Sequence, residues 1–121
     1  MQLALLSGAI FGLLAVILGA FGAHALKKTL NDEQLKSFET GVKYQMYHAI
    51  VLLVIGSSSL TIQKSIAWLF IIGTCLFSFS IYGLVLSDSK GKKMKFLGPI
   101  TPLGGLLLVA GWALLAYRFL S

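Results

Sequence analysis

The feature that most constrains this chain is an apolar stretch of membrane length near its start, from Gly8 to His24. Small residues recur along it at steps of four, three, four and three: Gly8, Gly12, Ala15, Gly19 and Gly22. This spacing places them on one face of a helix. Membrane helices pack closely over small residues, because lipid gives them no hydrophobic reason to associate. The stretch therefore predicts a membrane helix whose small-residue face packs against another helix.

The composition excludes a soluble globular domain. Of the 121 residues, 57% are hydrophobic and only 12% are charged, whereas soluble domains carry roughly 25% charged residues. Four apolar segments approach the roughly 20 residues that span a bilayer as a helix, and none alternates with the period of a barrel strand. We place them at residues 3–26, 43–60, 65–86 and 101–120. The predicted fold class is all-α, an integral membrane four-helix bundle forming a single transmembrane domain over residues 1–121.

A cleaved signal peptide is the alternative for the first segment, because Ala23-His24-Ala25 has the small residues of a cleavage site. However, no Lys or Arg precedes the apolar run. The run is also longer than the roughly 7–15 residues of a signal core. We therefore expect the segment to be retained as a membrane helix.

The most polar region of the chain, residues 27–43, predicts a short amphipathic helix that leads into the second span. Asn31 is a favourable N-cap, and Asp32 and Glu33 follow in the first turn, where they complement the helix dipole. An apolar stripe then recurs at helical spacing at Leu35, Phe38 and Val42. This helix either lies at the interface or runs directly into the span.

The distribution of charge predicts the orientation in the membrane. Eight lysines lie in or beside the first and third connections, against Lys64 and Arg118 on the opposite side: Lys27, Lys28, Lys36, Lys43, Lys90, Lys92, Lys93 and Lys95. The positive-inside rule places both basic loops in the cytoplasm and both termini outside. Lys90, Lys92, Lys93 and Lys95 are also candidates for contact with anionic lipids, although topology alone accounts for them. Because the charges lie between apolar runs, we expect no nucleic-acid partner.

A polar cluster is predicted where the first two spans meet the cytoplasmic interface. His24 lies three residues inward from Lys27, and His48 lies five residues inward from Lys43. At 1.5 Å per residue both sit roughly 5–8 Å inside the basic boundary, so the two histidines are expected to share a depth and to face each other. The whole cluster comprises His24, Tyr44, Gln45, Tyr47 and His48, with Glu39 within reach.

Four interpretations of this cluster remain open. The simplest is structural, since histidines and tyrosines at an interface bond each other, water and lipid headgroups. The others are a proton-linked or ion-linked site, a metal or haem site, and a lipid-headgroup site. No metal-ligand or haem-attachment spacing, nucleotide loop, hydrolase elbow or paired carboxylate within a span is present. We therefore predict no catalytic residues, no metal and no cofactor, and we expect the lone Cys75 to be an inert core residue.

Two motifs carry a resemblance to a known family. They are GAFGAHAL at residues 19–26 and FETGVKYQMYHA at residues 38–49. Together they resemble the paired motifs of a bacterial membrane family catalogued as domain-of-unknown-function family 423, or uncharacterised protein family 0382, which has eukaryotic relatives similar to transmembrane protein 256. The resemblance implies a small multi-pass protein of the bacterial plasma membrane. It implies no activity, substrate or cofactor.

Two functional hypotheses follow. In the first, the chain is a non-enzymatic structural or accessory protein that binds lipid or a membrane partner, which is either another protein or a second copy of itself. In the second, it is a small transporter or channel subunit that uses the histidine cluster as a proton-sensitive gate at the cytoplasmic interface.

Overall fold

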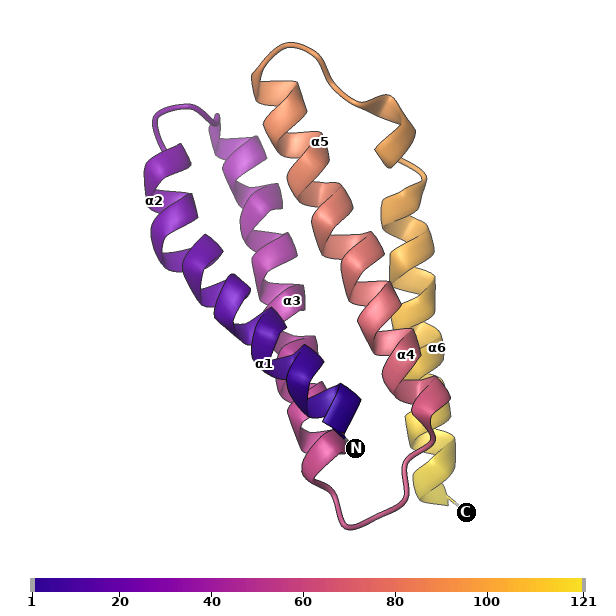
Figure 1. Cartoon of the computed structure of the whole chain (residues 1–121). Coiled ribbons are helices and arrows are strands. Elements are labelled where there is room, and N and C mark those ends of the chain that lie inside the picture. Colours follow the sequence, from indigo (N-terminus) through magenta and orange to yellow (C-terminus); the bar gives the residue numbers. More distant parts are fainter. Residues whose placement is uncertain (1, 121) are drawn as a thin grey trace.

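The chain folds into four helical rods that run alternately in opposite directions (Figure 1). The computed structural model describes residues 2–120, and of Ala23 it describes only the backbone. Across that range the elements are helices and connecting turns, without a strand. The predicted all-α membrane helical fold is confirmed. The first rod comprises α1 (Gln2–Ile17), a π-helical turn (Leu18–Gly22) and α2 (Ala23–Leu26); the second is α3 (Asp32–Ser57); the third comprises α4 (Lys64–Thr74), a π-helical turn (Cys75–Phe79) and α5 (Ser80–Ser89); the fourth is α6 (Ile100–Leu120), preceded by a 3₁₀ turn (Lys95–Leu97).

The helix α3 begins where the sequence predicts. The Asn31 side chain accepts a hydrogen bond from the Gln34 backbone N–H at 2.7 Å, and the Gln34 side chain accepts one from the Asn31 N–H at 3.0 Å. This reciprocal capping box satisfies two donors that the helix itself leaves unpaired. From there the amphipathic lead-in continues unbroken into the second rod, and α3 is a single helix of 26 residues.

Three of the rods are long and apolar enough to cross a membrane: Gln2–Leu26, Lys64–Ser89 and Lys95–Leu120. The predicted second span, residues 43–60, is not among them, because Lys43, Gln45 and His48 lower its hydropathy. Yet α3 joins the far end of the first rod to the near end of the third (Figure 1). It therefore runs alongside the apolar rods. Its Gln45 and His48 are buried and paired with neighbouring rods, as described below, whereas Lys43, Tyr44 and Tyr47 are exposed.

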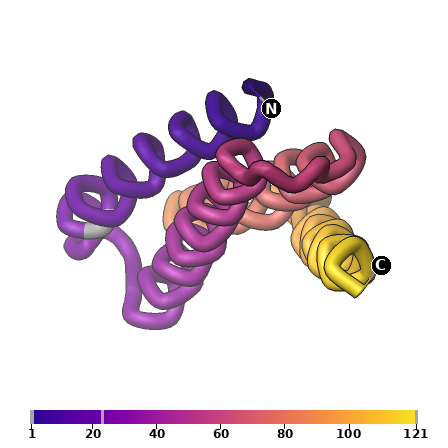
Figure 2. The backbone as a smooth tube through the Cα atoms, turned by 90° about the horizontal axis from the view of Figure 1, so that it is seen from below, coloured from indigo at the N-terminus to yellow at the C-terminus, as the bar shows by residue number. Residues whose placement is uncertain are grey.

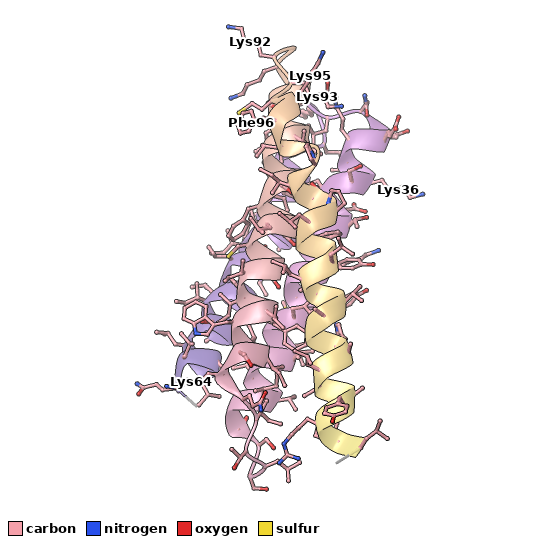
Figure 3. The ribbon with its side chains drawn as sticks, turned by 90° about the vertical axis from the view of Figure 1, so that its right-hand side faces the viewer. Lys36, Lys64, Lys92, Lys93, Lys95 and Phe96 are labelled. Atoms are coloured by element: carbon pink, nitrogen blue, oxygen red, sulfur yellow. The ribbon has the colours of Figure 1, made fainter. Side chains whose placement is uncertain are left out.

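The rods are arranged with α3 and the third rod in the middle. The helix α3 packs against α1 on one side and against α4, α5 and the second π-helical turn on the other, while α6 packs against the third rod. Seen from the end, α1 and α6 lie on opposite sides of the molecule (Figure 2). Both termini lie at the same end as the turn between α3 and α4, and both basic loops lie at the opposite end (Figures 1 and 3). We call the latter the basic-loop end.

The small-residue stripe of the first rod, which runs from α1 into the π-helical turn, faces α3. A methyl group added at Gly8 would lie 2.8 Å from the carbonyl oxygen of Ala49, and one at Gly19 would lie 3.2 Å from Val42. Gly8 and Ala15 are buried in this contact. At Gly8 the two helices therefore approach so closely that their backbones touch, as small residues allow in membrane proteins.

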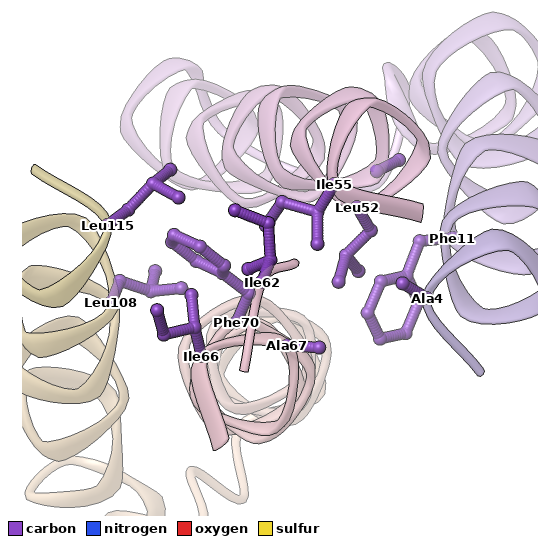
Figure 4. Packing of buried hydrophobic residues seen from close by; sticks show 11 residues of the cluster. Ala4, Phe11, Leu52, Ile55, Ile62, Ile66, Ala67, Phe70, Leu108 and Leu115 are labelled. Atoms are coloured by element: carbon purple, nitrogen blue, oxygen red, sulfur yellow. The ribbon is translucent and has the colours of Figure 1, made fainter. Parts of the chain in front are cut away.

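Two clusters of apolar side chains fill the interior. The larger lies toward the termini and draws on all four rods, with Phe11, Leu52, Phe70 and Leu108 among its members (Figure 4). The smaller lies at the basic-loop end and comprises Leu30, Phe38, Tyr82 and Val85. Between the two clusters α3 buries its polar side chains.

Candidate functional site

Gln45 lies fully buried at the centre of the molecule, with 0% of its surface exposed. Its side-chain Nε2 donates to the backbone carbonyl of Phe11 at 2.9 Å, and its Oε1 accepts from the Tyr82 hydroxyl at 2.7 Å. One amide thus joins the first, second and third rods. Nearby, the Ser78 hydroxyl donates to the carbonyl of Gly41 at 2.7 Å. Hydrogen bonds between membrane helices contribute about 0.6 kcal/mol each on average. The main effect of this network is therefore to fix the position of the rods relative to one another, and its contribution to the free energy of unfolding is small.

His48 is also buried, with 4% of its surface exposed, and both ring nitrogens have partners. Nε2 lies 3.1 Å from the indole Nε1 of Trp112, and Nδ1 lies 2.6 Å from the carbonyl oxygen of Tyr44. An indole N–H can only donate, so Nε2 is the acceptor and Nδ1 carries the proton that is donated to Tyr44. The geometry therefore assigns a neutral imidazole that joins α3 to α6.

His24 and His48 lie far apart, and the expected pairing of the two histidines was wrong. Gly12 of α1 lies beside Ala49, so His48 is level with about the twelfth residue of the first rod. His24 follows twelve residues later, which is roughly 18 Å further along the helix axis. It is exposed at the basic-loop end.

His24 and His48 would share a depth only if the second helix met the interface at Lys43. In fact α3 begins at Asp32, eleven residues before Lys43. The helix therefore carries His48 well past the level of His24, and equal distances from a lysine do not mean equal depths.

The remaining members of the predicted cluster lie on the outside of α3. Tyr44, Tyr47 and Glu39 are all exposed. The Tyr44 ring packs on Phe77, with 4.7 Å between ring centroids, and also on Tyr47 at 5.8 Å. The predicted cluster thus divides into two buried, fully paired residues, Gln45 and His48, and an exposed aromatic and acidic face.

A cleft of about 480 Å³ opens at the basic-loop end. Its walls come from the first turns of α3, from α5, from the segment between α5 and α6, and from the first turn of α6. Glu33, Asp88 and Lys93 are its charged residues, and an apolar floor is formed by Ile81, Leu84, Val85 and Pro102. Of the four lysines expected to contact anionic lipid, Lys93 lines the cleft, and the exposed Lys90, Lys92 and Lys95 stand in or beside the same loop.

One hydrogen bond fixes the two sides of this cleft relative to each other. The side-chain Nε2 of Gln34 donates to a carboxylate oxygen of Asp88 at 2.9 Å. The other end of the Gln34 amide is held by the capping box with Asn31. Within residues 2–120, neither Glu33 nor Lys93 has an ion-pair partner. The cleft therefore presents two carboxylates and one ammonium group, of which only Asp88 is engaged by the protein.

Sequence reasoning missed three of these partners. Trp112 and Tyr82 lie in apolar segments and give no sign of which helix they contact. Asp88 stands in the sequence beside a run of lysines, and nothing there indicates that Gln34, 54 residues away, donates to it. In the described part of the chain, no three His, Cys, Asp or Glu residues lie close enough to hold a metal ion. Cys75 is a free, half-buried thiol within the third rod.

Comparisons with known proteins agree with the resemblance carried by the two motifs. A family model described as "Protein of unknown function (DUF423)" matches residues 18–105. A UPF0382 membrane protein of Staphylococcus haemolyticus is 41% identical over 118 residues, which cover 95% of this chain and 93% of that protein. One from Bacillus subtilis is 40% identical over 120 residues, covering 95% and 94%. One from Schizosaccharomyces pombe is 41% identical over 109 residues, covering 87% and 91%.

No solved structure matches the chain significantly. The family match spans the π-helical turn of the first rod, all of α3 and the third rod, and the lead-in to α6. It therefore includes both motifs, the hydrogen bond between Gln45 and Tyr82, and every residue that lines the cleft, whereas Phe11, the other partner of Gln45, lies outside the match. The chain belongs to the family of membrane proteins of unknown function described as DUF423, whose curated relatives are named UPF0382 membrane proteins.

Proposed function

We propose that this chain is a non-enzymatic accessory protein of the plasma membrane that binds lipid at its basic-loop end. The observation that carries the proposal is the cleft there, which combines the charged side chains of Glu33, Asp88 and Lys93 with apolar lining residues beside the second lysine-rich loop. Lysine side chains beside a membrane attract the negatively charged phosphate groups of lipids. The same end, by the charge count, faces the cytoplasm. The bilayer therefore surrounds the rods and supplies the ligand.

The second hypothesis, a proton-sensitive transporter or channel subunit, has less support. It depends on a histidine cluster at the cytoplasmic interface, but His24 and His48 lie roughly 18 Å apart along the helix axis. Both ring nitrogens of His48 are occupied by Tyr44 and Trp112. The hypothesis predicts pH-dependent flux into proteoliposomes that His24→Ala or His48→Ala abolishes, and equal flux in the double variant would remove both histidines from any such mechanism.

Native mass spectrometry of the protein, extracted gently at normal expression, tests the accessory function. We expect phospholipid to remain bound to the protein, either alone or with a second copy or another membrane protein. Replacing Lys90, Lys92, Lys93 and Lys95 with Gln should remove most of that lipid. A protein that retains neither lipid nor partner would contradict the proposal.

The first basic region offers a matched control. Replacing Lys27, Lys28, Lys36 and Lys43 with Gln removes the same number of charges and leaves the same number to direct topology. We expect this control to retain more lipid than the variant of the second loop. Equal losses in the two variants would mean that net charge, and not the cleft, governs the retention of lipid.

A further inference from the structure

We propose that the cleft at the basic-loop end binds the headgroup of an aminophospholipid, in which a primary ammonium group and a phosphate are close neighbours. The inference rests on the lipid-binding function proposed above and names the class of lipid. Glu33 and Asp88 receive the ammonium group, and Lys93 receives the phosphate. The apolar floor receives the glycerol and the first part of the acyl chains.

The charges of the cleft select a zwitterion. Glu33 and Asp88 together repel a headgroup that carries only negative charge, while Lys93 repels one that carries only positive charge. A headgroup with one charge of each sign satisfies all three side chains. Charge-assisted hydrogen bonds of this kind are about twice as strong as neutral ones.

The lining also distinguishes a primary ammonium group from choline. A quaternary ammonium group has no N–H to donate, and proteins recognise it with the faces of aromatic rings. None of the residues that line the cleft is aromatic. Carboxylates instead suit an ammonium group that donates hydrogen bonds. The cleft therefore favours an ethanolamine-type headgroup over a choline headgroup.

The polarity of the cleft follows that of a lipid standing in the bilayer. Asp88 lies at the outer end of α5, and Ile81 lies seven residues deeper, roughly 10 Å along the axis. The carboxylates of Glu33 and Asp88 thus lie at the end of the cleft nearest the water, and the apolar floor lies toward the membrane interior. A volume of about 480 Å³ is within the range of sites that hold small molecules.

Asp88 is held in place before a ligand arrives. Its carboxylate accepts from Gln34, whose other amide atom is fixed by Asn31 at the start of α3. A fixed acceptor costs less conformational entropy on binding than a mobile one. Glu33, in the first turn of the same helix, stands beside this arrangement without a partner of its own.

The test is binding of lipid to the purified, delipidated full-length protein in detergent. Phosphatidylethanolamine, phosphatidylcholine and phosphatidylglycerol with identical acyl chains are added separately, and the bound fraction is measured by native mass spectrometry. We expect phosphatidylethanolamine to bind about tenfold more tightly than phosphatidylcholine, as the gain of a charge-assisted hydrogen bond implies. Glu33→Gln and Asp88→Asn should each reduce this preference severalfold.

Two neighbouring residues provide matched controls. Asp32→Asn removes an acidic group from the same first turn of α3, but Asp32 does not line the cleft. Lys93→Gln should weaken the binding of all three lipids, because each carries the phosphate, and Lys92→Gln is its matched control because Lys92 does not line the cleft. Both controls should keep the preference of the parent protein. Asp88→Asn retains an oxygen that can accept from Gln34, and unchanged circular dichroism and thermal unfolding will show that each variant is folded.

The outcomes separate this inference from the broader function. Equal binding of phosphatidylethanolamine and phosphatidylcholine, or a preference unchanged in both carboxylate variants, would overturn the headgroup assignment and leave lipid binding intact. Failure to bind any of the three lipids would overturn both proposals. Glycerophosphoethanolamine, which lacks acyl chains, should not displace the lipid at equal concentration, and displacement would overturn a lipid as the ligand.

Discussion

The indole N–H of Trp112 donates a hydrogen bond to Nε2 of His48 over 3.1 Å, and this bond joins α6 to α3. The rings meet edge to face, with centroids 6.0 Å apart. Phe70 of α4 packs against both of them, at 5.7 Å from His48 and 5.5 Å from Trp112. A polar residue of the least apolar rod is thereby enclosed by aromatic residues of two apolar rods, and its imidazole is paired within the protein.

Replacing Trp112 with Phe should destabilise the protein by about 1–2 kcal/mol, because it leaves Nε2 of His48 buried without a donor. The matched control is Trp68→Phe in α4. Trp68 is 46% exposed and Trp112 is 47% exposed, so the two changes remove similar exposed surface. Trp68→Phe should change the free energy of unfolding by less than about 0.5 kcal/mol. Unfolding in mixed detergent micelles measures both, and equal effects would assign the cost to lost volume.

The hydrogen bond between Tyr82 and Gln45 should appear as coupling in a double-mutant cycle. Tyr82→Phe leaves Oε1 of Gln45 without its donor, and Gln45→Met leaves the Tyr82 hydroxyl without its acceptor. We expect the double variant to be less destabilised than the sum of the single variants by about 0.5–1.5 kcal/mol. Additive effects in the same unfolding measurement would show that the bond contributes nothing. Tyr47→Phe, on the exposed face of α3, should be nearly neutral.

Two adjacent glycines in α6 should respond oppositely to alanine. A methyl group at Gly104 would overlap the backbone nitrogen of Phe77 and lie 2.8 Å from the carbonyl carbon of Leu76. Because backbone atoms cannot move aside, Gly104→Ala should cost about 1–3 kcal/mol or more. At Gly105 the nearest atom would lie 3.7 Å away, on the Phe77 ring. Gly105→Ala should therefore be neutral or stabilising by up to about 1 kcal/mol, through its higher helix propensity.

The orientation predicted from the lysine count can be tested by labelling with a membrane-impermeant maleimide. In a Cys75→Ala background, Ser59→Cys places a thiol in the turn at the end shared with the termini, and Thr29→Cys places one at the basic-loop end. Both positions are exposed. We expect Ser59→Cys to react in intact cells, and Thr29→Cys to react only after permeabilisation. The reverse pattern would place the basic loops outside.

Local patterns in the sequence were sufficient for the helices and several of their ends. Asn31 followed by acidic residues predicts the start of α3, because capping depends on residues within one turn. The small-residue stripe from Gly8 to Gly22 predicts a face for close packing, since the period of a helix fixes which side chains share a face. The membrane character follows from composition and segment length alone. The family follows from two motifs in the same sequence.

Tertiary structure alone decided which residues meet. The period of a helix specifies the face on which His24 or His48 lies, but not the height at which that face contacts its neighbour. The position along the helix axis is set by the packing of α1 against α3. In this packing Gly12 lies beside Ala49, and the two histidines lie roughly 18 Å apart along the axis. The same packing brings Gln45 to Tyr82, His48 to Trp112, and Glu33, Asp88 and Lys93 to one cleft, because contacts between distant segments depend on how whole helices slide and rotate against each other.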